Sequence, residues 1–196
     1  MAHIAILGLG NWGTAVARMW LLEGHKVKGW TIEQEVYESV VMDGVNKKYL
    51  PDHSVEGLEA TMRIDEALDG VEIVVLAIPS SVILDVVDDI IPHLRPGHVL
   101  IDLAKGLAPG KRLISQAIHE KLKVAQKSNP LAVVTGPTIA PEAAGGVITT
   151  ALVASEDESV AKRLADTLTT QTFILHAASD PVGAELWGAF KNVIAL

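Results

Sequence analysis

The sequence has no cysteine among its 196 residues. This absence excludes disulfide bonds, thiolate metal sites and cysteine nucleophiles, and it is consistent with a reducing, cytoplasmic location. Histidine occurs only 7 times, and residues such as His3, His25 and His53 stand singly, without the spacing of metal ligands. We therefore expect neither a metal site nor a catalytic thiol.

Basic residues are too few to favour a polyanionic partner. The chain has 16 Lys and Arg against 24 Asp and Glu, a formal net charge of −8. The densest basic stretch, residues 111–127, is interrupted by Glu120 and is typical of the solvated face of a helix. We expect no nucleic-acid binding.

Long apolar runs are also missing. The most apolar stretch, residues 71–87, is broken by Pro79 and two serines. The N-terminus has no basic region ahead of a long apolar segment, so it does not resemble a signal peptide. We expect a soluble protein without an integral membrane segment.

What the sequence does contain is a regular alternation of short apolar segments with segments of helical period. This pattern predicts an α/β fold: a doubly wound, mostly parallel Rossmann-type sheet with helices on both faces. The strands are expected at 3–7, 25–30, 61–64, 71–78, 97–104, 131–136, 147–155 and 172–177. Ser80 or Ser81 is expected to cap a helix after the fourth strand, and Ser155 is expected to open the helix at 156–170. The other helices are expected at about 12–22, 33–44, 65–70 and 111–124.

A glycine-rich loop, GLGNWG, follows the first predicted strand at residues 8–13. Its spacing is G-x-G-x-x-G, and it stands between a buried strand and a helix, as dinucleotide binding requires. Gly8 would permit the tight turn, Gly10 would let the backbone approach a pyrophosphate, and Gly13 would let the helix pack closely on the strand. The free N–H groups at the helix start would then face the phosphates.

Cofactor choice depends on the end of the second strand. An acid there favours NAD, and a nearby arginine accommodates NADP. The stretch KGWTIEQE offers Glu33, one or two residues later than ideal, and no arginine. The residues therefore favour NAD, although Glu33 is equally consistent with a solvated helix residue.

Six motifs occur in order along almost the whole chain. Together they resemble the NAD(P)-dependent glycerol-3-phosphate dehydrogenases, and the GPTIA and GAFKNV segments are the most specific of them. The motifs are GLGNWGTAVA (8–17), NKKYLPD (46–52), VLAIPS (75–80), AKGL (104–107), VTGPTIAPE (134–142) and GAELWGAFKNVIAL (183–196).

The resemblance implies roles for individual residues. Asn11 and Trp12 in the glycine loop, and Ala140, would contact the cofactor. Lys105 would contact both cofactor and substrate. The residues that would contact the substrate, besides Lys105, are Gly136, Thr138, Lys191 and Asn192.

The resemblance also implies a reaction, the reversible reduction of dihydroxyacetone phosphate to sn-glycerol 3-phosphate by NADH or NADPH. Lys191 would be the catalytic acid/base, because a cation that can give up a proton stabilises the charge developing on the ketone oxygen. A second ammonium group, that of Lys105, would lower the pKa of Lys191 by charge repulsion. From the residues alone, Lys105 could instead be a surface lysine, Lys191 part of an amphipathic helix, and GPTIAPE a proline turn.

Members of the family continue with a helical domain that supplies an aspartate and an Arg-Asn pair to the substrate site. We expect residues 1–180 to form the dinucleotide-binding domain and residues 181–196 the first helix of that second domain, apparently truncated. The isolated chain would bind cofactor with little turnover. The bare apolar face of this helix would favour a homodimer or other self-association. Two alternatives to a glycerol-3-phosphate dehydrogenase remain. One is another dehydrogenase of the hydroxyacid or 6-phosphogluconate type, and the other is a non-catalytic dinucleotide-binding module.

Overall fold

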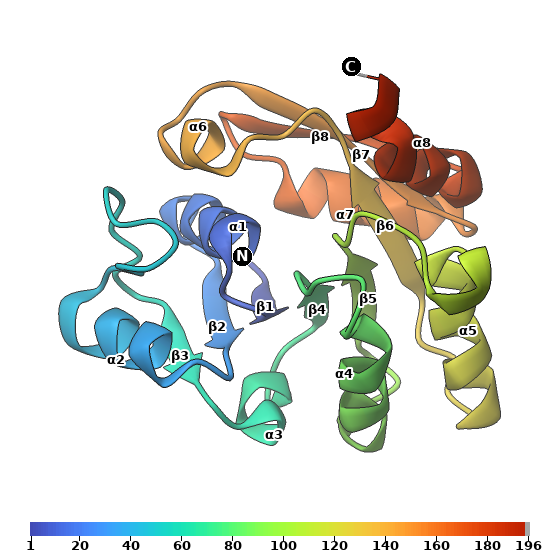
Figure 1. Cartoon of the computed structure of the whole chain (residues 1–196), viewed down its shortest axis with the longest axis horizontal. Helices are drawn as coiled ribbons and strands as arrows, with labels where there is room; N and C mark the ends of the chain where they lie inside the picture. The colour runs from blue at the N-terminus through green and yellow to red at the C-terminus, as the bar shows by residue number, and fades with distance from the viewer. Residues whose placement is uncertain (195–196) are drawn as a thin grey trace.

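A single eight-stranded sheet runs through the molecule (Figure 1). The computed structural model describes the backbone of residues 1–194 and the side chains of residues 1–190. The strand order is β3-β2-β1-β4-β5-β6-β7-β8. The strands are β1 (His3–Leu7), β2 (Lys26–Trp30), β3 (Glu59–Thr61), β4 (Ile73–Leu76), β5 (Val99–Asp102), β6 (Leu131–Thr135), β7 (Thr149–Ser155) and β8 (Phe173–Ala178).

The first six strands are parallel, and β7 and β8 run in the opposite direction. The pair β6–β7 is antiparallel, whereas β7 and β8 are parallel to each other. The strand order reverses between β1 and β4, which are neighbours in the sheet although β2 and β3 lie between them in sequence. In an open α/β sheet, the carboxyl ends of the strands at such a reversal are the usual place for a ligand. The prediction of a mostly parallel Rossmann-type sheet is confirmed.

Helices cover both faces of the sheet, as the continuous burial of the central strands requires. One core contains side chains of α1, α2 and α7, and the other contains side chains of α3, α4 and α5. The helices are α1 (Asn11–Leu22), α2 (Gln34–Asp43), α3 (Ile64–Leu68), α4 (Ile83–Ile90), η1 (Ile91–His93), η2 (Pro109–Lys111), α5 (Ile114–Val124), α6 (Ala140–Ala144), α7 (Glu158–Leu168) and α8 (Pro181–Ile194).

The two halves of the sheet are joined by contacts of α1 with α7 and β8, which lie far from it in sequence. Trp20 of α1 is buried, and its indole Nε1 donates a hydrogen bond of 3.0 Å to the carbonyl of Leu168 in α7. Trp12, at the start of α1, packs edge-to-face on Phe173 of β8, with ring centroids 5.8 Å apart. These aromatic contacts hold the first helix against the end of the chain that forms β7 and β8.

One predicted strand, residues 61–64, is wrong. The strand β3 ends at Thr61, and Ile64 already begins α3. The cause is the Thr61 hydroxyl, which accepts a hydrogen bond of 3.0 Å from the Arg63 amide and so turns the chain out of the sheet.

Both predicted serine caps are also wrong. Val82 is the N-cap of α4, because the Pro79 carbonyl turns the preceding residues. Asp157, not Ser155, caps α7 by accepting the Ser159 amide at 2.9 Å. Ser155 instead belongs to β7, where its hydroxyl donates to the Leu131 carbonyl at 2.9 Å. The Ser155 hydroxyl therefore links β7 to β6 rather than starting α7.

Among the described residues, no helix combines the length and the apolar character needed to cross a bilayer. Within the same residues, no group of three or more His, Asp or Glu side chains is arranged to hold a metal ion.

Candidate functional site

The glycine loop forms a tight connection between β1 and α1. Gly8 has a φ of +101°, and a Cβ at this position would lie 2.5 Å from the Ala77 carbonyl oxygen. A Cβ at Gly13 would lie 1.9 Å from the Gly8 carbonyl oxygen. Gly10, the N-cap of α1, differs from both, because a Cβ there would meet no atom within 4 Å. Two glycines thus let backbones pack together, and the third leaves room above the start of the helix.

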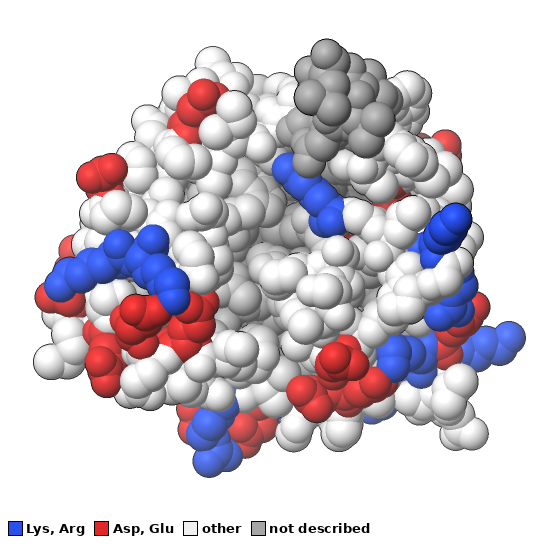
Figure 2. Space-filling model, in the orientation of Figure 1, with Lys and Arg blue, Asp and Glu red and all other residues white. Residues whose placement is uncertain are grey.

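A cavity of about 630 Å³ opens at this point, over the carboxyl ends of β1, β2, β4 and β5. Its size is in the range of small-molecule and cofactor sites. Figure 2 shows the hollow near the middle of this face, surrounded mainly by uncharged side chains. The residues that line it are Gly8, Leu9, Gly10, Asn11, Trp12, Gly13, Trp30, Thr31, Ile32, Glu33, Tyr49, Ala77, Ile78, Pro79, Val82, Val86, Leu103, Ala104, Lys105, Thr138 and Ala140.

This lining contains the residues named in the sequence for cofactor contact: Gly8, Gly10, Asn11, Trp12, Gly13, Lys105 and Ala140. The space above Gly10 and the N-terminus of a twelve-residue helix fit the pyrophosphate of a dinucleotide. The remaining walls are largely apolar, which suits the flat faces of adenine and nicotinamide.

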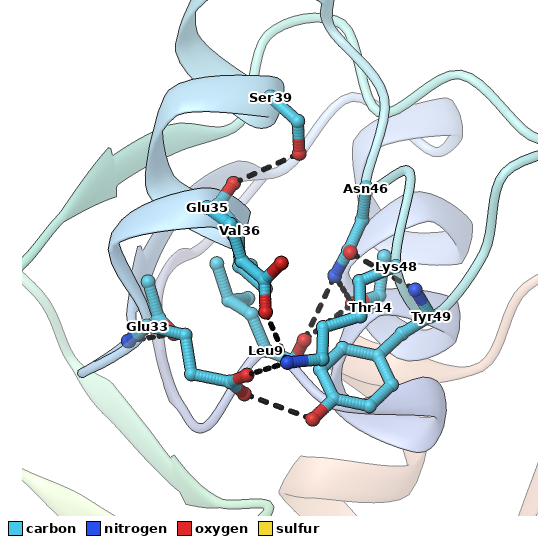
Figure 3. Close-up of polar contacts among 10 residues, drawn as sticks. Leu9, Thr14, Glu33, Glu35, Val36, Ser39, Asn46, Lys48 and Tyr49 are labelled. Atoms are coloured by element: carbon cyan, nitrogen blue, oxygen red, sulfur yellow. Dashed lines mark hydrogen bonds and ion pairs between the residues drawn. The ribbon is translucent and has the colours of Figure 1, made fainter.

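The segment after α2 is fastened to the glycine loop by Asn46, which is fully buried. Its Nδ2 donates to the Leu9 carbonyl and to the Thr14 hydroxyl, both at 2.8 Å (Figure 3). Its Oδ1 accepts the Tyr49 amide at 3.2 Å. One amide side chain therefore fixes both the carbonyl of the glycine loop and the backbone of residues 46–49.

Residues 48 and 49 then reach the carboxylate of Glu33, beyond the end of β2. Lys48 Nζ lies 2.6 Å from Glu33 Oε2, and the Tyr49 hydroxyl donates to Glu33 Oε1 at 2.9 Å (Figure 3). Lys48 also forms a salt bridge with Glu35. The hydrogen bond from Lys48 lowers the pKa of Glu33, so this carboxylate is ionised at neutral pH.

The other side of the cavity begins at the end of β5. Asp102, the last residue of this strand, is 2% exposed, and its Oδ1 accepts the Ala104 amide at 2.8 Å. Its Oδ2 finds no hydrogen-bond partner in the described part of the chain. Burial is the main reason that the pKa of Asp102 rises to about 8. The group is thus mostly protonated at neutral pH and supports the turn that leads to Lys105 structurally.

The predicted substrate residues Gly136 and Thr138 form a tight turn after β6, in which the Thr138 amide donates to the Gly136 carbonyl at 2.9 Å. A Cβ at Gly136 would lie 2.8 Å from the Thr150 carbonyl oxygen of β7. Thr138 lines the cavity, whereas Gly136 packs on the neighbouring strand.

Helix α8 passes this same strand end, because a Cβ at Gly188 would lie 2.5 Å from the Thr135 hydroxyl oxygen. Lys191 and Asn192 belong to the next turn of α8. Their side chains lie outside the described residues.

Helix α8 is anchored by Glu185, a buried carboxylate that the sequence analysis did not single out. Its Oε1 accepts the backbone amides of Ile114 at 2.5 Å and of Ser115 at 3.2 Å, and its Oε2 accepts the Ser115 hydroxyl. It therefore satisfies the free amides at the start of α5 from a different helix. Seventy-one residues separate the partners Glu185 and Ile114, so no local pattern reveals the contact.

The comparisons with known proteins agree with this geometry. A family model described as the N-terminus of NAD-dependent glycerol-3-phosphate dehydrogenase matches residues 3–161. The chain belongs to the NAD-dependent glycerol-3-phosphate dehydrogenase family. Its glycine loop, the Asn46–Tyr49 segment and the Lys105 turn all fall within the matched residues of this family.

Named members of the family are similar to the chain over nearly its whole length. The glycerol-3-phosphate dehydrogenase [NAD(P)+] of an Exiguobacterium species is 38% identical over 198 residues, which cover 100% of this chain and 58% of the relative. That of Syntrophotalea carbinolica is 35% identical, covering 99% of this chain and 59% of the relative. The chain thus spans less than two thirds of the length of these curated relatives.

A solved structure shows the same fold. The crystal structure of glycerol-3-phosphate dehydrogenase from Coxiella burnetii matches with a TM-score of 0.89 at 33% identity. The match covers 99% of this chain and 59% of that one.

The sequence analysis missed the contribution of residues 46–49 to the cavity. It used the motif NKKYLPD only as part of a resemblance. The burial of Asn46 and its contact with Leu9 could not be found from a local pattern, because the two residues lie 37 positions apart. Glu33 was considered, and its position as N-cap of α2 at the cavity wall separates it from the solvated face of that helix.

Proposed function

We propose that this chain is the cofactor-binding part of an NAD(P)-dependent glycerol-3-phosphate dehydrogenase, which interconverts dihydroxyacetone phosphate and sn-glycerol 3-phosphate. The observation that carries the proposal is the cavity over the carboxyl ends of β1, β2, β4 and β5, which joins the glycine loop to Lys105 and Thr138. Family membership supports the reaction, and the cavity supports the binding of a dinucleotide.

In this proposal, the start of α1 holds the pyrophosphate of the cofactor. The backbone of Gly10 leaves the space for it, and the amide groups of the first turn of α1 supply donors and a favourable dipole. Asn11, Trp12 and Ala140 contact the cofactor from the cavity wall. A bound nicotinamide supplies or accepts the hydride.

Two lysines are proposed to contact the substrate, Lys191 and Lys105. Lys191 transfers a proton to the ketone oxygen in reduction and accepts it in oxidation, and Asn192 lies beside it in sequence. Lys105 contacts cofactor and substrate from the end of β5, and its charge favours the neutral form of Lys191. Thr138 and Gly136 contact the substrate from the turn after β6. The passage of α8 beside Thr135 supports this arrangement, because residue 191 follows within one helical turn of Gly188.

Further parts of the proposal concern organisation. Residues 1–180 form the dinucleotide-binding domain, and residues 181–196 begin a helical substrate domain. The protein works in the cytoplasm and associates with a second copy through α8, where Trp187 is 68% exposed and Phe190 49% exposed.

The test is a binding titration followed by a transfer assay with the 196-residue chain. We expect NADH to bind with a dissociation constant in the micromolar range, and a Gly10→Ala variant to bind at least about tenfold more weakly. With 4-deuterated NADH and dihydroxyacetone phosphate in long incubations, we expect slow stereospecific deuterium transfer that the Lys191→Met variant loses.

Other outcomes favour the alternatives or overturn the proposal. Transfer between the cofactor and 6-phosphogluconate or a hydroxyacid, but not dihydroxyacetone phosphate, would assign the chain to another dehydrogenase type. Cofactor binding without any transfer would support a non-catalytic dinucleotide-binding module. The absence of NADH binding by the folded chain would refute the proposed function altogether.

A further inference from the structure

The wall of the cavity beside the end of β2 carries a cluster that the proposed reaction does not use. It consists of Glu33, Glu35, Lys48 and Tyr49, called here the β2-end cluster. The inference drawn from it rests on the proposed function, since it concerns which dinucleotide that cavity accepts.

The position of the cluster follows from the backbone around the first glycine. The Gly8 amide donates to the carbonyl of Trp30, the last residue of β2, at 2.9 Å. The end of β2 is therefore tied directly to the glycine loop. A dinucleotide whose pyrophosphate lies at the start of α1 places its adenosine ribose beside this strand end.

A short turn brings Glu33 to that place although it comes three residues after β2. The Thr31 hydroxyl accepts the Glu33 amide at 3.1 Å, and the Glu33 carbonyl then accepts the Tyr37 amide at 3.0 Å, so the chain turns at once into α2. Residues 30–33 all line the cavity. The turn thus places Glu33 at the cavity although this residue lies three positions after the end of β2.

The orientation of the Glu33 carboxylate is set by residues 48 and 49. Each of its oxygens has one partner, Lys48 for Oε2 and Tyr49 for Oε1. Each oxygen keeps a further lone pair for another donor. The Tyr49 amide is in turn held by Asn46, which is bonded to the glycine loop. The carboxylate is therefore fixed relative to the loop that would hold the pyrophosphate.

The charge of the cluster is negative. Two carboxylates and one ammonium group give a sum of −1, and the Tyr49 phenol adds no charge, since the neighbouring Glu33 raises its pKa further above neutral pH. Lys48 is committed to the two glutamates rather than facing the cavity, since Glu33 and Tyr49 line the cavity and Lys48 does not. The surface presented to the ribose is thus an anionic acceptor.

We propose that Glu33, oriented by Lys48 and Tyr49, selects NAD(H) against NADP(H) at the adenosine ribose. The 2′-hydroxyl of NAD(H) can donate a hydrogen bond to the carboxylate. The 2′-phosphate of NADP(H) has no such proton to give and carries close to two negative charges, so the cluster repels it. Selection therefore combines a hydrogen bond to one ligand with charge repulsion of the other.

The experiment compares two single substitutions that change the charge equally. Glu33→Gln and Glu35→Gln each remove one negative charge from the cluster, but Glu35 does not line the cavity. Dissociation constants for NADH and NADPH are measured by titration calorimetry at fixed ionic strength, and circular dichroism checks that each variant is folded.

We expect wild-type protein to bind NADH at least about tenfold more tightly than NADPH, because acid and hydroxyl pair while acid and phosphate repel. Glu33→Gln should reduce this ratio by about tenfold or more, weakening NADH and strengthening NADPH. Glu35→Gln should strengthen NADPH only slightly and leave NADH unchanged, because exposed charges are screened. Lys48→Met should weaken NADPH further.

Three results would overturn the inference. The first is equal affinity of the wild-type protein for NADH and NADPH. The second is a Glu33→Gln variant with an unchanged ratio of the two dissociation constants. The third is a Glu35→Gln variant that changes this ratio as much as Glu33→Gln does. The last result would show a general charge effect without a contact to the ribose. Failure to bind either dinucleotide would refute the proposed function, and this inference would fall with it.

Discussion

The two ends of the sheet are built differently. On the side of β1 to β5, all strands are parallel, and the cavity residues are tied together by buried polar contacts such as that of Asn46 with the glycine loop. On the side of β6 to β8, the direction of the strands reverses, and two aromatic side chains of α8 are exposed, Trp187 at 68% and Phe190 at 49%. The first region supplies most of the cavity lining, and the second adds Thr138 and Ala140. The second region also presents exposed aromatic side chains, which often mark a contact surface.

This comparison separates the proposed cofactor contacts from the proposed acid/base. The contacts proposed for the dinucleotide come mainly from the first region, whereas Lys191 belongs to α8 in the second region. Variants of the first region should therefore change cofactor binding or the packing around the cavity, and variants of α8 should change hydride transfer, stability or association.

Among substitutions compared at one pH, the largest loss of stability is expected in the glycine loop. Gly13→Ala should destabilise the fold by about 3 kcal/mol, because its methyl group would lie 1.9 Å from the Gly8 carbonyl oxygen in backbone that cannot yield easily. Gly10→Ala is the matched control, since its methyl group meets no atom within 4 Å. Urea unfolding should show a large loss for Gly13→Ala and almost none for Gly10→Ala. Equal losses would contradict the packing role assigned to Gly13.

A similar but smaller loss is expected in the second region. Glu185→Ala should lower the free energy of unfolding by about 2 kcal/mol, since the amides of Ile114 and Ser115 would lose a charged acceptor while buried. The control is Asp166→Ala on the exposed side of α7, which should change stability by less than about 0.5 kcal/mol. If both substitutions have the same small effect, Glu185 does not anchor α8.

The pH dependence of stability should reveal Asp102. Its pKa is about 8 in the folded chain, mainly through burial, and near 3.9 in an unfolded chain. Between these values the folded state binds one more proton, so this group makes stability fall as pH rises, by at most about 1.4 kcal/mol per pH unit. Above pH 8 its contribution levels off.

Asp102→Asn removes this titration. The difference in unfolding free energy between the variant and the wild-type protein should therefore move in favour of the variant from pH 5 to pH 8. Urea titrations at four pH values measure it. A difference that stays constant over this range would show that Asp102 has an ordinary pKa.

The smallest effect on stability is expected at the exposed surface of α8. Trp187→Ser should change the free energy of unfolding by less than about 0.5 kcal/mol, because the side chain is 68% exposed. It should nevertheless reduce self-association in sedimentation velocity runs at increasing concentration. A wild-type chain that sediments as a monomer at all concentrations would remove the proposed association through α8.

Much of the fold could be predicted from the sequence because its signals are local. The run HIAIL and the following glycines determined β1, the turn and α1, since each depends on neighbouring residues. The strand at 61–64 could not be placed correctly, because the end of β3 depends on a hydrogen bond that the Arg63 amide donates to the Thr61 hydroxyl, which strand propensity does not predict.

The candidate site divides in the same way. The cofactor residues of the glycine loop, Lys105 and Ala140 were named from motifs, and all of them line one cavity. The neighbours that complete it, Asn46 and Tyr49, were not named. Their partners Leu9 and Glu33 lie 37 and 16 residues away, and only folding brings them together.

The sequence by itself determined the order of strands and helices, the glycine turn and the family, because these depend on short-range patterns and on motif order. Only the tertiary structure decided which acid lines the cavity beyond the end of β2 and which carboxylate fastens α8. Both depend on polar groups from distant segments, which meet and form hydrogen bonds only when the chain folds.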